Sequence, residues 1–264
     1  MSKVTIKDIA KYCNVSTATV SYVINNKETQ SISEDTRSKI LHAVNMLNYK
    51  PSVIAKNLRT VPQHKLVAIY TDESSKYLNR LEFLHILDKS SEYFAKHNMS
   101  LIYGRKPYGL INNADALLSY NLSLEEFREL GESNFIPLIA LDSLINDHLF
   151  FQVTTNYLKI KNDADKIFDH YTFIGLKPSS LELMNKINSI FSNVKLISKV
   201  EDLNDITSNN IVTDSKVIYD YFSSKENTNV LYNDKTLDKK IEQVYKCIEQ
   251  ALSHNPYDIH FCEI

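Results

Sequence analysis

The sequence of 264 residues contains no tryptophan, four glycines and three cysteines, and it lacks any long apolar run. The absence of about eighteen consecutive apolar residues excludes a transmembrane helix, and no signal peptide precedes Thr5. Cys13, Cys247 and Cys262 are odd in number, far apart and without metal-ligand spacing, so they indicate reduced, buried thiols. These absences predict a cytoplasmic protein without a membrane anchor.

Arrangements typical of catalytic sites are also missing. The eight histidines form no H-x-x-x-H or H-E-x-x-H pattern. There is no phosphate-binding glycine loop, nucleophile elbow or Cys–His constellation. The sequence therefore predicts no metal, no cofactor and no enzymatic activity. An enzyme built on an α/β core would be favoured again by turnover of a sugar derivative.

Residues 5–25 contain a pattern for two short helices joined by a tight turn. Thr5 and Asp8 form an N-cap with a returning carboxylate, Asn14 tolerates the left-handed conformation, and Ser16 can cap the second helix. The expected buried positions are Ile6, Ile9, Ala10, Val20, Val23 and Ile24. The opposite face of the second helix carries Thr17, Ala18, Ser21, Tyr22 and Asn25. Small polar groups on a short helix suit base edges in the major groove, whereas an ordinary helical hairpin would simply expose them to water.

A third helix and the distribution of charge favour the interpretation that this segment binds nucleic acid. Ser33 can cap a helix whose apolar positions are Thr36, Ile40, Leu41, Val44 and Leu47. Residues 1–60 contain nine basic and four acidic residues, a net charge of +5, whereas the remainder carries −7. A basic head on an acidic body is the charge distribution expected for phosphate binding.

The first sixty residues resemble the LacI/GalR family of bacterial transcriptional regulators. The matching segments are Thr5–Ala10, Val15–Ser21, Asn25, Ser33–Arg37, Leu47–Pro51 and the ending Ala55-x-x-Leu58-Arg59. The resemblance implies that Thr17, Ala18 and Tyr22 read bases in the major groove. At the last of these positions the family usually has arginine, so Tyr22 implies a different half-site. The phosphate-holding positions implied by the family are Ser16, Ser21, Asn25 and Tyr49.

The resemblance also implies a hinge helix over Pro51 to Arg59 that orders on DNA in the minor groove. Leu58 matches the family's leucine wedge, which kinks the duplex. The remaining DNA-binding positions expected from the match are Thr5, Ala55, Asn57 and Arg59. Alone, the segment is too short and polar to persist as a helix, and without DNA we expect it to be a flexible linker.

From residue 65 onward, short apolar strands alternate with amphipathic helices, which predicts parallel α/β sheets. The expected strands are Leu66–Thr71, Leu101–Gly104, Ala116–Ser119, Pro137–Asp142, Phe151–Thr154, Thr172–Gly175, Val194–Ile197, Val230–Tyr232 and Asp258–Cys262. The expected helices are Leu78–His97, Leu124–Ser133, Tyr157–Asp169, Leu181–Phe191, Ser215–Phe222 and Leu237–His254.

The resemblance implies the same architecture, an all-α helix-turn-helix head followed by an α/β periplasmic-binding-protein-like core of two lobes that dimerises. The expected domains are a DNA-binding head at 1–49, a hinge and linker at 50–62, and an effector-binding-like core at 63–264. The core is shorter than is typical of the family, so we expect a reduced second lobe.

The second lobe also departs from the family pattern in its chemistry. No arginine follows Arg128, and Leu176–Met184 replaces the family's effector-anchoring Arg and Gly-aromatic pair. A surviving effector site should lie at the carboxyl ends of the first-lobe strands. Its candidate residues are Tyr70, Thr71, Asp72, Asp142 and, from the second lobe, Lys177. Alternatively, Asp72 and Asp142 merely cap the turns that follow their strands.

Two functional hypotheses follow. The first is a dimeric repressor of a palindromic operator in double-stranded DNA, controlled by a sugar-like small-molecule effector. The second is a DNA-binding regulator that has lost small-molecule sensing and acts constitutively or through a protein partner.

Overall fold

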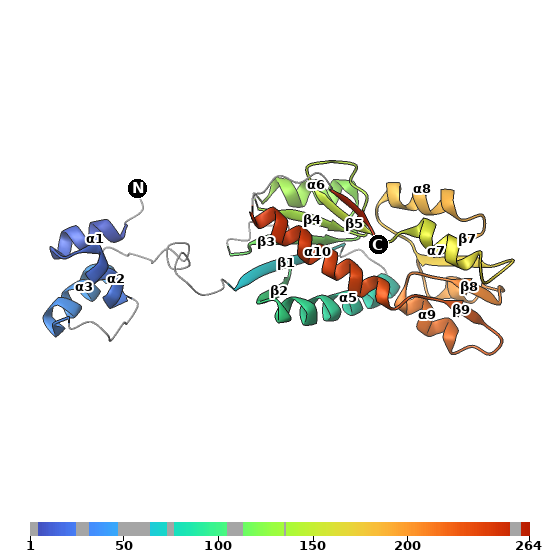
Figure 1. The fold of residues 1–264 in the computed structure, drawn as a ribbon, viewed down its shortest axis with the longest axis horizontal. Coiled ribbons are helices and arrows are strands. Elements are labelled where there is room, and N and C mark those ends of the chain that lie inside the picture. Colours follow the sequence, from blue (N-terminus) through green and yellow to red (C-terminus); the bar gives the residue numbers. More distant parts are fainter. Residues whose placement is uncertain are drawn as a thin grey trace. The chain divides into compact units, whose positions relative to one another are not determined.

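The computed structural model describes residues 5–24, 32–46, 64–72, 77–104, 113–134, 136–253 and 260–264. The chain divides into two compact units, the head (Met1–Gln63) and the core (His64–Ile264), shown in Figure 1. The expected hinge at residues 50–62 lies outside the described residues.

In its described residues, the head contains the helices α1 (Ile6–Cys13), α2 (Thr17–Ile24) and α3 (Glu34–Met46). Their shared core contains Ile9, Val20 and Ile40, each fully buried. This confirms the apolar faces expected for the three helices, with one exception. Leu41 was expected in the core but is 45% exposed, because Ile40 and Ala43 occupy the inward positions of α3 and Leu41 lies one residue further round the helix.

The first lobe of the core is built on a six-stranded parallel sheet in the order β10-β5-β4-β3-β1-β2. The strands are β1 (Lys65–Thr71), β2 (Met99–Tyr103), β3 (Ala116–Tyr120), β4 (Leu138–Leu141), β5 (Phe151–Thr154) and β10 (Phe261–Glu263). Its hydrophobic strands are buried on both faces, as expected for a parallel sheet covered by helices.

Helices cover both faces of this sheet (Figure 1). Helices α5 (Tyr77–Lys96) and α10 (Lys235–Ser253) pack on one face, and α6 (Leu124–Glu132) packs on the other. Strand β1 contributes side chains to the core on both faces of the sheet. Val67 and Ile69 face α5 and α10, whereas Ala68 and Tyr70 face α6.

The second lobe has a four-stranded parallel sheet in the order β7-β6-β8-β9. Its strands are β6 (Thr172–Leu176), β7 (Val194–Ile197), β8 (Asn210–Val212) and β9 (Asn229–Leu231). Helices α7 (Tyr157–Ala164) and α8 (Leu181–Ile190) cover one face, and α9 (Lys216–Ser223) covers the other with the short helix η1 (Glu201–Leu203). The chain enters this lobe after β5 and returns to the first lobe after β9.

The expected fold class, two α/β lobes with a smaller second one, is confirmed. Strand β8 was not predicted, because only Ile211 and Val212 are apolar in a run of three residues. The helix expected over Tyr157–Asp169 ends at Ala164 and continues as turns. Within the described part of the chain, no helix has the length and apolar character needed to span a membrane.

Candidate functional site

The start of α2 is the most exposed part of the helix-turn-helix. The Thr19 backbone N–H donates to Ser16 Oγ at 3.0 Å, which satisfies one of the free N–H groups at the beginning of the helix. Thr17 and Ala18 are exposed on the first turn. They are therefore accessible to a ligand along the helix N-terminus.

The second turn of α2 continues the same side of the helix. Ser21 and Tyr22 follow Thr17 and Ala18 by four residues, and positions four apart share a helix face. Both side chains are partly buried against the head. The structure thus brings four of the predicted DNA-contacting residues together on one side of α2.

Local hydrogen bonds fix the start of α1 and the turn between α1 and α2, and so set the direction of α2. Asp8 Oδ2 accepts from the Thr5 backbone N–H at 2.8 Å and from the Thr5 hydroxyl at 2.7 Å, and these bonds lower the pKa of the Asp8 carboxyl. Asn14 has φ of 54°, and the Val15 N–H donates to the Ala10 carbonyl at 3.0 Å. These contacts confirm the cap and the left-handed turn expected from the sequence.

Several predicted DNA-contacting residues cannot be placed. Those outside the described residues are Asn25, Tyr49, Ala55, Asn57, Leu58 and Arg59.

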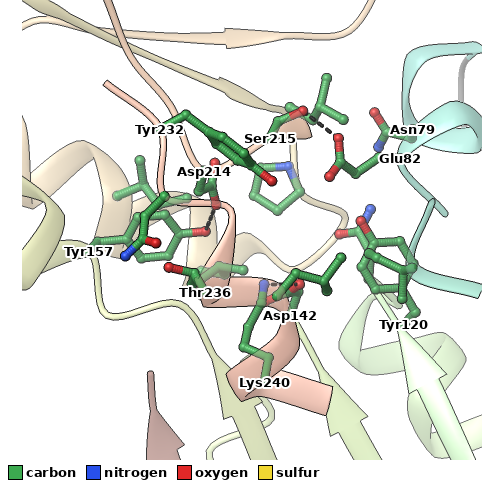
Figure 2. A pocket seen from close by; sticks show the side chains of 18 residues that line it. Asn79, Glu82, Tyr120, Asp142, Tyr157, Asp214, Ser215, Tyr232, Thr236 and Lys240 are labelled. Carbon is green, nitrogen blue, oxygen red and sulfur yellow. Dashed lines mark hydrogen bonds and ion pairs between the residues drawn. The ribbon is translucent and has the colours of Figure 1, made fainter. Parts of the chain in front are cut away.

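A second candidate site is the cavity between the two lobes of the core, here called the cleft cavity (Figure 2). Its volume is about 60 Å³, well below that of a typical small-molecule site, and it is partly open to solvent. Both lobes contribute to its lining. Its polar lining residues include Asn79, Glu82, Tyr120, Asp142, Tyr157, Asp214, Tyr232, Thr236 and Lys240.

A buried ion pair closes the first-lobe side of the cleft cavity. Lys240 Nζ on α10 donates to both carboxylate oxygens of Asp142, at 3.0 and 2.8 Å, and to Thr155 Oγ1 at 3.1 Å. The two charged side chains are 7% and 15% exposed. All three ammonium donors of Lys240 are therefore used within the protein.

A buried carboxylate lies on the second-lobe side. Tyr157 OH donates to Asp214 Oδ2 at 2.8 Å, as Figure 2 shows. Burial raises the pKa of Asp214 from 3.8 to about 6, opposed by the charge of Lys240 and by the Tyr157 hydrogen bond. Burial likewise raises the pKa of Tyr157 well above its usual value. At neutral pH Asp214 is mostly ionised at a cost in folding free energy.

Asp214→Asn should remove a pH-dependent destabilisation of the core. The folded state holds the Asp214 proton up to about pH 6, whereas the unfolded state releases it near 3.8, so this group costs stability as pH rises between these values. Relative to the wild type, the variant should gain about 2 kcal/mol in unfolding free energy between pH 4.5 and 7.5. Urea unfolding at both pH values measures this, with the exposed Asp234→Asn as control. A constant difference across pH would contradict the buried setting of Asp214.

Glu82 joins the two lobes directly. From α5 in the first lobe, its carboxylate accepts from Ser215 Oγ at 2.5 Å, the Lys216 N–H at 3.2 Å and the Val217 N–H at 3.1 Å. These groups form the beginning of α9 in the second lobe. A carboxylate at a helix N-terminus satisfies free N–H groups and interacts favourably with the helix dipole.

Further hydrogen bonds cross between the lobes near Glu82. Asn79 Nδ2 donates to the Lys177 carbonyl at 3.2 Å, and the Ser179 N–H donates to Asn121 Oδ1 at 2.9 Å. Ser180 Oγ accepts from the Leu144 N–H at 3.2 Å. We call these contacts, with those of Glu82, the inter-lobe lock. These contacts, made by the chain's own residues, hold the two lobes together across the cleft.

Comparison with known proteins assigns the head. Residues 5–52 match the model of the lacI family of bacterial regulatory proteins. The head therefore has the sequence of a lacI-family DNA-binding segment.

The chain is also similar to transcriptional repressors named PurR. It is 27% identical over 168 residues to the HTH-type transcriptional repressor PurR of Haemophilus influenzae, covering 55% of this chain and 47% of that protein. It is 29% identical over 150 residues to PurR of Actinobacillus pleuropneumoniae, covering 52% and 43%. The chain thus spans about half the length of these relatives.

Solved structures of the family share the fold. The Lac repressor bound to ONPG in the repressed state has a TM-score of 0.51 and 14% identity, covering 100% of this chain and 97% of that one. A LacI family regulator from Clostridium acetobutylicum has a TM-score of 0.50 and 12% identity, covering 76% and 97%. This likeness concerns the fold.

The effector residues expected from the sequence are only partly brought together in the core. Asp142 lines the cleft cavity, whereas Tyr70, Thr71, Asp72 and Lys177 are not among its described lining residues. Tyr70 is buried in the first-lobe core that faces α6. Lys177 approaches the cavity through its carbonyl, which accepts from Asn79. The role of these residues in effector binding stays a prediction.

Among the described lining residues of the cleft cavity, the charged side chains that were not predicted are Glu82, Asp214 and Lys240. Asp214 carries a usable signal, because it follows a strand and precedes the capping residue Ser215. Glu82 and Lys240 lie within amphipathic helices, where charged residues normally indicate a solvated face. In the described residues, no group of three or more histidines, cysteines or acids is placed to hold a metal ion.

Proposed function

We propose that the protein is a sequence-specific, DNA-binding transcriptional regulator that represses from an inverted-repeat operator as a homodimer in the cytoplasm. The observation that carries this proposal is the lacI-family match over residues 5–52, with Thr17 and Ala18 exposed at the start of α2. The net charge of +5 in residues 1–60 supports attraction to phosphates. The repressor names of the PurR relatives support the direction of regulation.

The roles proposed for individual residues on DNA follow from their positions on α2. Thr17, Ala18 and Tyr22 read base edges, while Ser16 and Ser21 hold the phosphate backbone. The proposal extends these roles to Thr5 in the described head and to residues outside the described part of the chain. Thr5, Asn25 and Tyr49 contact the backbone, and the hinge residues Ala55, Asn57, Leu58 and Arg59 enter the minor groove.

Tyr22→Arg tests the reading role directly. Arginine offers a two-pronged donor to guanine, so the preferred half-site should gain a guanine at one position, with a preference over other bases of roughly ten- to a hundredfold. Selection of bound duplexes from a random library reveals the change. Tyr12→Arg adds the same charge at an exposed site on α1 and should leave the preferred sequence unchanged. An unaltered half-site in Tyr22→Arg would contradict the proposed facing of α2.

A cleft ligand that alters operator affinity is the first form of control we propose. The polar lining of the cleft cavity, which comes from both lobes, supports this form. Asn79 Oδ1 is buried and has no hydrogen-bond partner within the protein, so a ligand donor would satisfy it.

The second candidate is a regulator without small-molecule sensing, acting constitutively or through a protein partner. The inter-lobe lock favours it, because Glu82, Asn79 and Ser180 already make the contacts that hold the lobes together. The donors of Lys240 are likewise occupied.

A thermal-shift screen of sugars, phosphosugars and nucleosides separates the two forms of control. A compound that binds the folded state at a hundred times its Kd adds about 2.7 kcal/mol of stability, which raises the melting temperature by several kelvin. Such a compound should also change operator affinity, in agreement with the first candidate. No shift with any compound would support the ligand-insensitive regulator.

A further inference from the structure

The three cysteines occupy two different environments. Cys13 is buried in the head, where its Sγ lies 3.7 Å from the Lys39 carbonyl. In the core, Cys247 on α10 is buried and Cys262 on the edge strand β10 is half-buried. The sequence predicted reduced, buried thiols, and all three cysteines are free, although Cys262 is only half-buried. The fold also brings Cys247 and Cys262 together at one side-chain amide, that of Gln243. Parallel pairing of β10 with β5 returns the chain to α10 and creates this contact.

A single side-chain amide donates hydrogen bonds to both core thiols. Gln243 lies one turn before Cys247 on α10, and its Nε2 donates to Cys262 Sγ at 3.3 Å and to Cys247 Sγ at 3.7 Å. An N–H donor directed at a sulfur favours the thiolate over the thiol. The chain therefore provides a thiolate-stabilising group where two sulfurs meet.

The two thiols differ in acidity. The Cys247 thiol lowers the pKa of Cys262 to about 7, aided by Gln243 and opposed by burial. The hydrogen bond with Cys262 and burial both raise the pKa of Cys247 far above its usual range. Cys262 is therefore suited to attack as a thiolate, and Cys247 to act as the resolving thiol. Peroxide-reactive sites commonly combine two such cysteines.

We propose that Cys262 and Cys247 form a dithiol site that reacts with hydroperoxides and closes to an intramolecular disulfide. The Cys262 thiolate attacks the distal peroxide oxygen, the O–O bond breaks, and a sulfenic acid forms as water or an alcohol leaves. Cys247 sulfur then attacks the sulfenic sulfur, the S–S bond forms, and water leaves with the thiol proton. Two thiols lose two electrons to one peroxide, and a dithiol reductant reverses the change.

The disulfide would join two elements next to the functional part of the core. Strand β10 pairs with β5 at the edge of the first-lobe sheet, and α10 carries Lys240 of the cleft cavity. A cross-link that closes a loop of about 15 residues restricts the unfolded chain more than the folded one. The oxidised protein should therefore melt at a higher temperature than the reduced protein.

Thiol counting on the full chain tests the site. Reduced protein, freed of reductant, is treated with hydrogen peroxide, unfolded, alkylated and mapped by mass spectrometry. Untreated protein should label at three cysteines. Treated protein should label at Cys13 alone, with the Cys247 and Cys262 peptides linked within one chain. Three labelled thiols, or a cross-link that involves Cys13 or joins two chains, would overturn the proposal.

Variants assign the roles of the two sulfurs. Cys247→Ser should trap Cys262 as a sulfenic acid that reacts with dimedone, whereas Cys262→Ser should abolish both the adduct and the disulfide. Gln243→Leu should slow alkylation of Cys262 at pH 7 several-fold, because less thiolate is present. Cys13→Ser is the control and should oxidise like the wild type. Equal dimedone labelling of Cys247 in Cys262→Ser would contradict the assignment of Cys262 as the attacking group.

Discussion

Lys240→Met is expected to destabilise the core by about 3–5 kcal/mol, the loss typical when one partner of a buried ion pair is removed. The reason lies in Asp142, whose carboxylate would remain buried without the two hydrogen bonds from Lys240 Nζ. Thr155 Oγ1 would lose a donor as well. Urea unfolding followed by circular dichroism measures the loss.

Neighbouring variants control this experiment. Lys239→Met removes the same charge from an exposed position of α10 and should change the unfolding free energy little. Lys240→Met combined with Asp142→Asn should recover part of the lost stability, because no buried charge remains and asparagine tolerates the left-handed φ of 53° at this position. Equal stability of the two lysine variants would show that the Lys240–Asp142 pair contributes nothing to the core.

Glu82→Gln is expected to open the inter-lobe lock and to cost about 2–3 kcal/mol. Glutamine keeps the length of the side chain but replaces an accepting oxygen by an NH₂ group. Lys216 N–H donates to Oε1 and Val217 N–H to Oε2, so the NH₂ group faces an N–H donor in either orientation, and the charge that complements the beginning of α9 is lost. Hydrogen exchange of the full chain should show faster exchange of these amides.

Glu92→Gln is the matched control on the same helix. Glu92 is exposed and pairs with Lys96 four residues on, so its replacement should leave exchange at the start of α9 unchanged. Equal protection of Lys216 and Val217 in the two variants would contradict the role of Glu82. If a cleft ligand is found, Glu82→Gln should also change its affinity, since Glu82 lines the cleft cavity.

The head could be predicted closely because its determinants are local. The Thr5–Asp8 cap, the left-handed Asn14 and the Ser16 cap each lie within three residues of the groups they contact. Leu41 was misplaced because an apolar residue beside Ile40 is not distinguished by spacing alone. Its exposure depends on how α3 packs against α1 and α2.

The core could be predicted in class and element order but not in its polar contacts. Alternating apolar strands and amphipathic helices indicate a parallel α/β fold whatever the details. In contrast, Glu82 and Ser215 are 133 residues apart, and Lys240 and Asp142 are 98 apart. Such pairs are created by tertiary packing, between the two lobes for Glu82 and Ser215 and within the first lobe for Lys240 and Asp142. The same holds for Cys247 and Cys262, which meet only when β10 joins the sheet.

The most direct test of the account is binding of the purified full chain to an inverted-repeat duplex obtained by selection from random DNA. We predict two chains per duplex, a large loss of affinity when one half-site is scrambled, and an affinity that falls steeply with salt. Equal binding to the intact and scrambled duplexes, or binding of a single chain, would contradict the central claim that the head recognises operator DNA as a symmetric pair.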